Sequence, residues 1–368
     1  MPVDIGRRPT PKRPRRSAGK TPRYVSSRRP DEGAAAWLLR CAPGLAKTLQ
    51  TELRFNGLVD RRTKGTLLWQ RNHDIVFLPQ LLRAPQAGDL RIAEEIHRCP
   101  VYGRYKISQH QLDVMAGVLR KGRSHLAVTV DGTRFNRHEL GRWLARELKQ
   151  RGAVLDDAAQ RAVFLFCVEN SYYFCLPSRT ATEAAGRAHR TAEREGSLPP
   201  TIAAAMAFLA NPRDGEMVLD PVCGSGTLLA EVHAYAPAAH LIGIDSDTGA
   251  INAARRNLGH VEGIRLSTGD ARATGLPAGS IGLFVANLPF GKQFGSRSQN
   301  QELYRDILHE IVRLGRPEGW RAQLLTSDSD ALKAAAADIG SLALLQAAPV
   351  KVRGEPAAIL TLRPDRPA

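Results

Sequence analysis

Residues 217–231 read Met-Val-Leu-Asp-Pro-Val-Cys-Gly-Ser-Gly-Thr-Leu-Leu-Ala-Glu, and they decide the fold of this chain. Residues 217–219 are an apolar run that ends at an Asp-Pro pair, a pattern typical of a short buried strand. Gly224 and Gly226 then predict a tight loop, and residues 227–236 carry the apolar positions of a helix. Ligands of doubly wound sheets bind beyond the carboxyl ends of the strands, so this loop is a candidate binding site.

Strands and helices alternate on both sides of this stretch. We expect helix 202–209, with Thr201 as its N-cap, before it. After it we expect strands at 241–244, 264–267, 281–286 and 321–325, helices at 248–258, 303–314 and 330–339, and a final strand pair near 342–352 and 357–362. This order predicts an α/β fold with a doubly wound, mostly parallel sheet that ends in an antiparallel hairpin.

Acidic side chains follow three successive predicted strands. Asp220 ends the first strand, Asp245 the second, and Asp270 follows the third. A carboxylate at the second strand end can accept both hydrogen bonds from a ribose. Leucine replaces the third glycine of a dinucleotide fingerprint, and no Gly-Lys-Ser/Thr follows, so the pattern fits neither a dinucleotide site nor a P-loop.

The arrangement resembles class I S-adenosylmethionine-dependent methyltransferases with a Rossmann-like fold. The resemblance implies that the glycine loop and the acid before it face the methionine part of the cofactor, that Asp245 binds the ribose, and that Asp270 receives the adenine amino group. The implied cofactor-binding residues are Asp220, Cys223, Gly224, Gly226, Thr227, Asp245, Ser246, Asp270, Ala271 and Asn287. The expected cofactor is S-adenosyl-L-methionine.

The fourth predicted strand ends in Asn287-Leu288-Pro289-Phe290, the candidate catalytic residues. The run resembles the Asn/Asp-Pro-Pro-Tyr/Phe motif of methyltransferases that act on exocyclic amines. An aryl amine has a delocalised lone pair, and the Asn287 oxygen and the Leu288 carbonyl can accept its hydrogens and turn the lone pair toward the methyl group. Phe290 can stack on a base. A strand stop at a proline turn is the alternative interpretation.

Two other methyl acceptors fit the sequence poorly. Methylation of cytosine C5 needs a thiolate at this strand end, and no cysteine lies between Gly224 and residue 368. The Lys-Asp-Lys-Glu set typical of ribose methylation cannot be assembled either. An exocyclic amine therefore remains the best acceptor.

The N-terminal half predicts an α+β region. It begins with a strand at 35–39, a helix at 44–55 and strands at 66–69 and 75–78, and the stretch 80–106 shows no clear pattern. A strand at 125–131, a helix at 137–151, and two strands at 161–167 and 172–176 follow. This order, with Val128-Thr-Val-Asp-Gly-Thr-Arg-Phe-Asn-Arg-His-Glu-Leu140, resembles the latter part of a THUMP domain, an RNA-binding module of tRNA-modifying enzymes. We expect a disordered basic tail at 1–33, the α+β and THUMP-like region at 34–180, a linker at 181–199 and the methyltransferase domain at 200–368. The candidate RNA-binding residues are Arg134, Arg137, His138, Arg187, Arg190 and Lys292.

Composition favours a nucleic-acid partner. The 368 residues carry a net charge of +16, with a pI near 10.1, which points to a polyanion before a membrane. The tail carries much of this excess, and it either follows phosphates or is a solvated extension. The five cysteines lack zinc-site spacing, so we expect reduced core thiols, no metal and a cytoplasmic location. We expect no membrane-spanning segment and no signal peptide.

These features together resemble THUMP-class tRNA guanine-N2-methyltransferases, because Asn-Leu-Pro-Phe-Gly is followed by Lys292 and by Gly295-Ser296. The resemblance implies methylation of the exocyclic N2 amine of a tRNA guanosine, at position 6, with position 10 as the alternative. Two other hypotheses stay open, namely an S-adenosylmethionine-dependent N-methyltransferase acting on rRNA or DNA, and an RNA-binding protein with a decayed catalytic domain.

Overall fold

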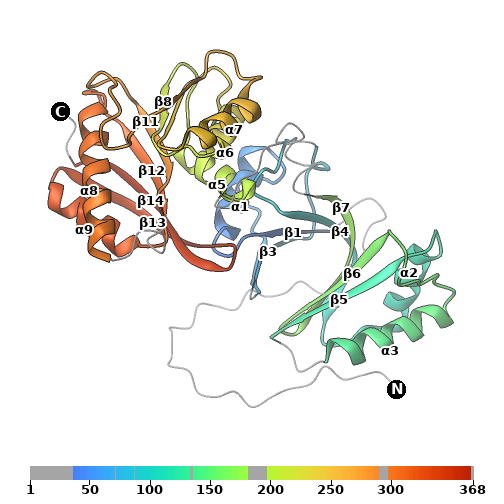
Figure 1. Cartoon of the computed structure of the whole chain (residues 1–368). Coiled ribbons are helices and arrows are strands. Elements are labelled where there is room, and N and C mark those ends of the chain that lie inside the picture. Colours follow the sequence, from blue (N-terminus) through green and yellow to red (C-terminus); the bar gives the residue numbers. More distant parts are fainter. Residues whose placement is uncertain are drawn as a thin grey trace, which may run out of the picture.

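The computed structural model describes residues 36–70, 72–86, 88–132, 136–180, 197–289 and 297–365. The described residues form two seven-stranded sheets, each with its own helices (Figure 1). The predicted basic tail, and most of the predicted linker, lie outside these residues. No helix among the described residues is both long enough and apolar enough to span a membrane.

The N-terminal sheet has the strand order β2-β3-β1-β4-β7-β6-β5. Its neighbours are antiparallel, except that β5 and β6 run parallel. The elements are β1 (Ala36–Cys41), α1 (Ala46–Phe55), β2 (Thr66–Trp69), β3 (Asp74–Leu78), β4 (Glu95–Arg104), α2 (Gln109–Leu119), β5 (His125–Asp131), α3 (Arg137–Gln150), β6 (Ala162–Val168) and β7 (Ser171–Thr180).

This sheet is strongly curled. The rings of Phe77 on β3 and Tyr173 on β7 lie 4.8 Å apart, although β1 and β4 separate these strands in the sheet. The Arg40 guanidinium on β1 likewise lies 5.2 Å from the ring of Phe166 on β6. The inner face of the curl is therefore a buried aromatic core, while α1 covers one half of the outer face and α2 and α3 cover the other (Figure 1).

One strand and one helix of the N-terminal region, β4 and α2, were not predicted from the sequence. β4 occupies part of the stretch 80–106, which gave no clear pattern, because it carries Arg98 and Pro100 among apolar residues. α2 begins at a capping box, in which the Ser108 hydroxyl accepts from the Gln111 backbone and the Gln111 side chain accepts from the Ser108 N–H. These bonds satisfy two of the amide groups that a helix start leaves unpaired.

The C-terminal sheet has the strand order β10-β9-β8-β11-β12-β14-β13, in which the first five strands are parallel. β14 inserts antiparallel between β12 and β13. The elements are α5 (Pro200–Ala210), β8 (Met217–Asp220), α6 (Thr227–Tyr235), β9 (His240–Asp245), α7 (Thr248–Leu258), β10 (Arg265–Thr268), β11 (Leu283–Asn287), α8 (Arg297–Leu314), β12 (Arg321–Thr326), α9 (Ser329–Ile339), β13 (Leu342–Val352) and β14 (Glu355–Pro364). The predicted doubly wound fold is confirmed.

The strand order reverses between β8 and β11. From β8 the chain adds β9 and β10 on one side, and then places β11 on the other. Helices α5, α6 and α7 lie on one face of the sheet, and α8 and α9 on the opposite face (Figure 1). The loops after β8 and β11 diverge at such a reversal and leave a crevice for a ligand.

The prediction that Thr201 caps α5 is wrong. The N-cap is Pro199, no side chain caps this helix, and Thr201 lies buried in its first turn. Pro200 at the first helical position has a backbone angle already suited to a helix and lacks the N–H that would need a cap, so the helix begins earlier. The Thr201 hydroxyl instead bonds the carboxylate of Glu94 in the N-terminal region.

The two halves of the molecule share one continuous apolar core, which includes residues of α1, α5, α6 and β13. Polar contacts join the same surfaces. Arg91 pairs with Glu231 of α6 at 2.7 Å. The fully buried Glu52 of α1 accepts from Tyr235 Oη at 2.8 Å, and also from the backbone N–H groups of Arg91 and Ile92. The helix that follows the glycine loop is thus fixed to the N-terminal region.

The buried carboxyl of Glu52 should make the free energy of unfolding depend on pH. Burial raises the pKa of its carboxyl to about 7 in the folded chain, above the ordinary 4.5. Between these values the folded state binds more protons, so the free energy of unfolding falls as pH rises, by up to about 3 kcal/mol. We expect the Glu52→Gln variant to lack this pH dependence. In urea titrations, the free energy of unfolding of the variant minus that of the original chain should therefore rise between pH 5 and pH 8. Parallel curves for the two chains would contradict the assignment.

Candidate functional site

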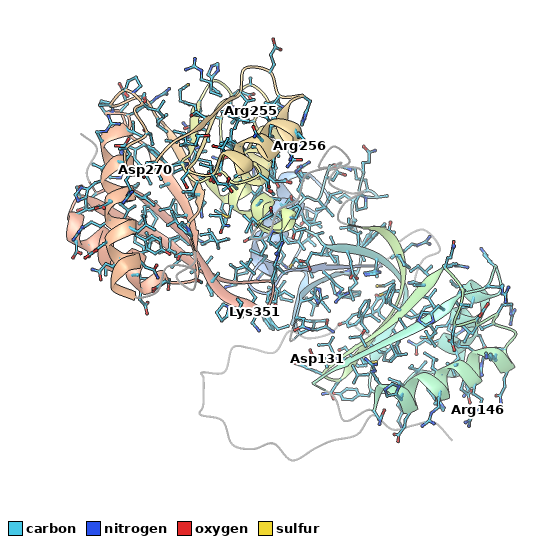
Figure 2. The ribbon with its side chains drawn as sticks, in the orientation of Figure 1. Asp131, Arg146, Arg255, Arg256, Asp270 and Lys351 are labelled. Atoms are coloured by element: carbon cyan, nitrogen blue, oxygen red, sulfur yellow. The ribbon has the colours of Figure 1, made fainter. Side chains whose placement is uncertain are left out.

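A cavity of about 940 Å³ lies at the crevice between β8 and β11. Its walls come from the loop after β8, the ends of β9, β10 and β11, the middle of α8, and the segment before α5. In Figure 2, Asp270 marks this end of the C-terminal sheet, and Arg146 marks the opposite end of the molecule. The lining residues used below are Ser197, Leu198, Asp220, Cys223, Gly224, Ser225, Thr227, Asp245, Ser246, Asp270, Ala271, Arg272, Asn287, Pro289, Leu303 and Ile307.

The candidate cofactor residues converge on this cavity. All of those predicted from the sequence line it, except Gly226. They come from four strand ends that lie side by side in the sheet, β10, β9, β8 and β11. Their convergence follows from the parallel arrangement, since the carboxyl ends of parallel strands share one edge.

Gly224 and Asp245 form the floor of the cavity. Gly224 has a φ of +55°, and a Cβ there would meet no atom within 4 Å, so its backbone faces open space. Its N–H donates to Asp245 Oδ2 at 2.8 Å, while the N–H of Asp247 donates to Oδ1 at 2.9 Å. Each carboxylate oxygen thus holds one backbone bond and keeps further acceptor capacity for a diol.

Gly226 serves helix packing instead. It has a φ of +80° and stands just before α6, and a Cβ there would lie 2.5 Å from Leu258 Cδ1 on α7. The residue therefore lets α6 approach α7 closely, and it does not line the cavity. The sequence pattern could not separate these two reasons for a glycine.

Asp220 and Cys223 are buried in the cavity wall. Burial raises the pKa of the Asp220 carboxyl well above its ordinary value, and the neighbouring charge of Asp245 raises it further. The Val222 N–H donates to this carboxyl at 3.1 Å. A cation beside Asp220 would stabilise its ionised form. Burial also raises the pKa of the Cys223 thiol, so this side chain is a protonated wall residue.

Asp270 is paired with Arg272, which was not among the predicted site residues. The Arg272 guanidinium donates to both of its carboxylate oxygens, at 3.0 and 2.7 Å, and this pairing lowers the pKa of the Asp270 carboxyl. Both residues line the cavity and are about half exposed. A ligand that bonds Asp270 therefore shares the carboxylate with Arg272.

Asn287 brings an unpaired acceptor to the same cavity. It is the last residue of β11, and its Oδ1 is buried without a hydrogen-bond partner in the described part of the chain. A buried acceptor without a partner costs free energy, so such an atom at a cavity wall marks a place for a donor. The Leu288 side chain is buried, and Pro289 lines the cavity. Phe290 lies outside the described residues.

Several cavity residues had no signal in the sequence. Ser197 and Leu198 belong to the predicted linker, and Leu303 and Ile307 belong to α8. The Ser197 hydroxyl lies 3.1 Å from that of Ser225 in the glycine loop. Leu303 and Ile307 are four residues apart, which places them on one helical face. Only the folded chain brings them to the cavity.

Two of the six candidate RNA-binding residues lie among the residues that the structure describes, and four do not. Arg137 and His138 are exposed at the start of α3, where Asn136 caps the helix by accepting from the His138 N–H. Arg134, Arg187, Arg190 and Lys292 lie outside the described residues. α3 continues with exposed Arg142, Arg146 and Lys149, for which the structure gives no ion pair within the residues that it describes. Their spacing places them on one face of the helix.

The described residues contain no group of three or more His, Cys, Asp or Glu side chains arranged to hold a metal ion. The five cysteines are buried as free thiols.

Comparisons with known proteins agree with this geometry. Residues 187–353 match the family model UPF0020, described as RMKL-like, methyltransferase domain. The chain is 30% identical over 161 residues to the bovine (Bos taurus) tRNA (guanine(6)-N(2))-methyltransferase THUMP3, a match that covers 40% of this chain and 32% of the relative. It is 33% identical over 144 residues to the mouse (Mus musculus) U6 snRNA (guanine-N(2))-methyltransferase THUMPD2. This match covers 38% of this chain and 26% of the relative. The matches thus span about a third or less of these curated relatives.

Among solved structures, the crystal structure of TrmN from Thermus thermophilus superposes with a TM-score of 0.71, at 23% identity, over 90% of this chain and 99% of that one. This likeness of fold extends beyond the C-terminal sheet, because it includes most of the N-terminal region. The predicted resemblance to methyltransferases is confirmed over residues 187–353.

Proposed function

Since residues 187–353 match a family model described as RMKL-like, methyltransferase domain, we propose that this protein transfers a methyl group from S-adenosylmethionine to the exocyclic N2 amine of a guanosine in tRNA. The observation that carries this proposal is the unpaired Asn287 Oδ1 in the wall of the cavity. It supplies an acceptor for an amine hydrogen at the end of β11, beside the glycine loop of β8.

The cavity fits the cofactor at three points. The open backbone at Gly224 leaves room for a ligand, the Asp245 carboxylate has acceptor capacity left for two ribose hydroxyls, and the buried Asp220 suits a cationic amino group. Asp270 and Ala271 stand at the far strand end, where an adenine amine would be bound. When bound, S-adenosylmethionine supplies an electrophilic methyl group.

The chain's own residues orient the acceptor. Asn287 Oδ1 and the Leu288 carbonyl oxygen each accept a hydrogen bond from the guanine amine, which turns its lone pair away from the purine ring. No strong base is required, because the protonated product amine is acidic. Pro289 restricts the backbone at this point, and Phe290 is proposed to stack on the extruded base.

The proposed substrate is tRNA, with guanosine 6 as the favoured position and guanosine 10 as the alternative. The relative named for guanosine 6 supports the first position, and the U6 snRNA relative shows that the amine chemistry also occurs on another RNA. Nucleoside mass spectrometry of tRNA methylated by the purified protein, with transcripts in which G6 or G10 is replaced, tests this assignment. Methyl transfer that survives loss of both guanosines would refute it.

We propose four segments with different roles. Residues 1–33 are a basic tail, residues 34–180 bind RNA and include the THUMP-like part, residues 181–199 are a linker, and residues 200–368 carry out catalysis. The net charge of +16 and the exposed basic face of α3 support this proposal. A cytoplasmic location stays a prediction.

A charge reversal tests the α3 surface. We expect Arg142→Glu with Arg146→Glu to weaken tRNA binding at least tenfold, and to reduce the salt slope by roughly 0.9 per lost phosphate contact. Binding curves at several salt concentrations measure both effects. The matched control is Lys333→Glu with Arg363→Glu, on α9 and β14, which removes the same charge from exposed positions at the other end of the molecule. Equal loss of binding in both double variants would mean that only net charge matters.

A further inference from the structure

A buried chain of hydrogen bonds supports the loop that follows Asn287. Tyr304 of α8 donates from its hydroxyl to the Pro289 carbonyl oxygen at 2.8 Å. The Tyr304 hydroxyl also lies 2.9 Å from Thr326 Oγ1, which accepts from the Asp328 N–H at 2.9 Å. Both Tyr304 and Thr326 are fully buried.

The chemistry of the partners fixes the direction of this chain. A carbonyl oxygen only accepts, so the single Tyr304 proton points to Pro289, and the Thr326 hydroxyl then donates to Tyr304. Burial raises the pKa of the Tyr304 phenol, which keeps that proton in place at neutral pH. Every donor in the chain therefore has one defined acceptor, and the arrangement has one low-energy form.

The loop is held on its other side as well. The Leu288 N–H donates to the Leu325 carbonyl oxygen of β12 at 2.9 Å, and the Leu288 side chain is buried. The Leu288 carbonyl is one of the two proposed acceptors of the amine. It thus lies between two hydrogen-bonded backbone groups, the Leu288 N–H before it and the Pro289 carbonyl after it. Neither bond uses Asn287, whose Oδ1 stays available.

We propose that Tyr304 is a positioning residue for methyl transfer. By holding the Pro289 carbonyl, it fixes the backbone directly after the Leu288 carbonyl, so that this carbonyl and Asn287 Oδ1 aim at the same amine. This inference rests on the proposed function. Tyr304 itself is separated from the amine by the loop that it holds. The two acceptors orient the amine only if each is placed correctly to within about an ångström. A misplacement of about 1 Å lowers the rate by up to roughly 10²-fold.

Tyr304→Phe isolates the hydroxyl, because the ring and its packing remain. We expect single-turnover methyl transfer at saturating RNA to slow by about 10–100-fold, with the affinity for S-adenosylmethionine unchanged. We also expect the Leu288 amide to exchange with deuterium roughly tenfold faster, as the loss of one buried hydrogen bond would allow. This second readout needs neither RNA nor cofactor.

The matched control is Tyr172→Phe in the N-terminal region, where a buried tyrosine hydroxyl likewise bonds a backbone carbonyl, that of Lys106, at 2.9 Å. It should leave the deuterium exchange of the Leu288 amide unchanged. Thr326→Ser keeps the hydroxyl that donates to Tyr304 and should behave like the original chain, whereas Thr326→Val should show part of the Tyr304→Phe effect.

The two readouts separate this inference from the proposed function. An unchanged rate, or unchanged Leu288 exchange, in Tyr304→Phe would overturn the positioning role. If the original chain transfers no methyl group to tRNA, the proposed function is refuted, and the exchange experiment still decides whether Tyr304 holds the loop.

Discussion

Asn287→Ala is expected to slow methyl transfer by at least about 10²–10³-fold, the range seen when one positioned polar group at a reacting centre is removed. The structural reason is that Oδ1 is a buried acceptor without a partner in the described part of the chain, at the wall of the cavity. Without it, one amine hydrogen of the guanine has no acceptor, and the lone pair returns to conjugation with the ring. Single-turnover transfer to tRNA, at saturating cofactor, measures the effect.

Cofactor binding gives the control for this variant. Calorimetry should find S-adenosylmethionine bound with nearly the original affinity, because Asp245, Gly224 and Asp220 are untouched. Asn287→Asp keeps an oxygen at the Oδ1 position and should retain more activity than Asn287→Ala. Near-normal turnover in Asn287→Ala would refute the amine-positioning role.

Asp245→Ala is expected to weaken binding of S-adenosylmethionine by at least about 10²-fold. Hydrogen bonds to a charged group contribute about 1.5–3 kcal/mol each, and the carboxylate is proposed to accept two of them from the ribose. The variant also removes the acceptors of the Gly224 and Asp247 N–H groups, so the glycine loop loses its brace. Titration calorimetry with the cofactor and with S-adenosylhomocysteine measures the loss.

Asp245→Asn distinguishes the two contributions. An amide keeps one oxygen, so it can hold one backbone N–H group but cannot accept two ribose bonds together with it. We expect its affinity to fall between that of the original chain and that of Asp245→Ala, with a folded loop. If Asp245→Ala binds the cofactor as tightly as the original chain, Asp245 has no part in the site.

The catalytic half was largely predictable because its signals are local. The strand before Gly224, the acids at strand ends and the run from Asn287 to Pro289 each lie within a few residues. Parallel strands then bring their carboxyl ends to one edge whatever the loops between them do. Most boundaries differ from the prediction by a residue or two, as at β10 and β11, but α8 begins at Arg297, six residues before the predicted start. β4 was missed because its burial depends on β1 and β7, which lie far from it along the chain.

The sequence by itself determined which strand ends carry chemistry, since residue type and spacing are properties of short segments. Only the tertiary structure decided the rest. It showed that Gly226 makes room for Leu258, that Arg272 shares Asp270, and that Thr201 faces Glu94. It also placed Tyr304 under Pro289 and Ser197 beside Ser225. Each of these contacts joins segments whose proximity depends on how helices pack on the sheet, which no local pattern specifies.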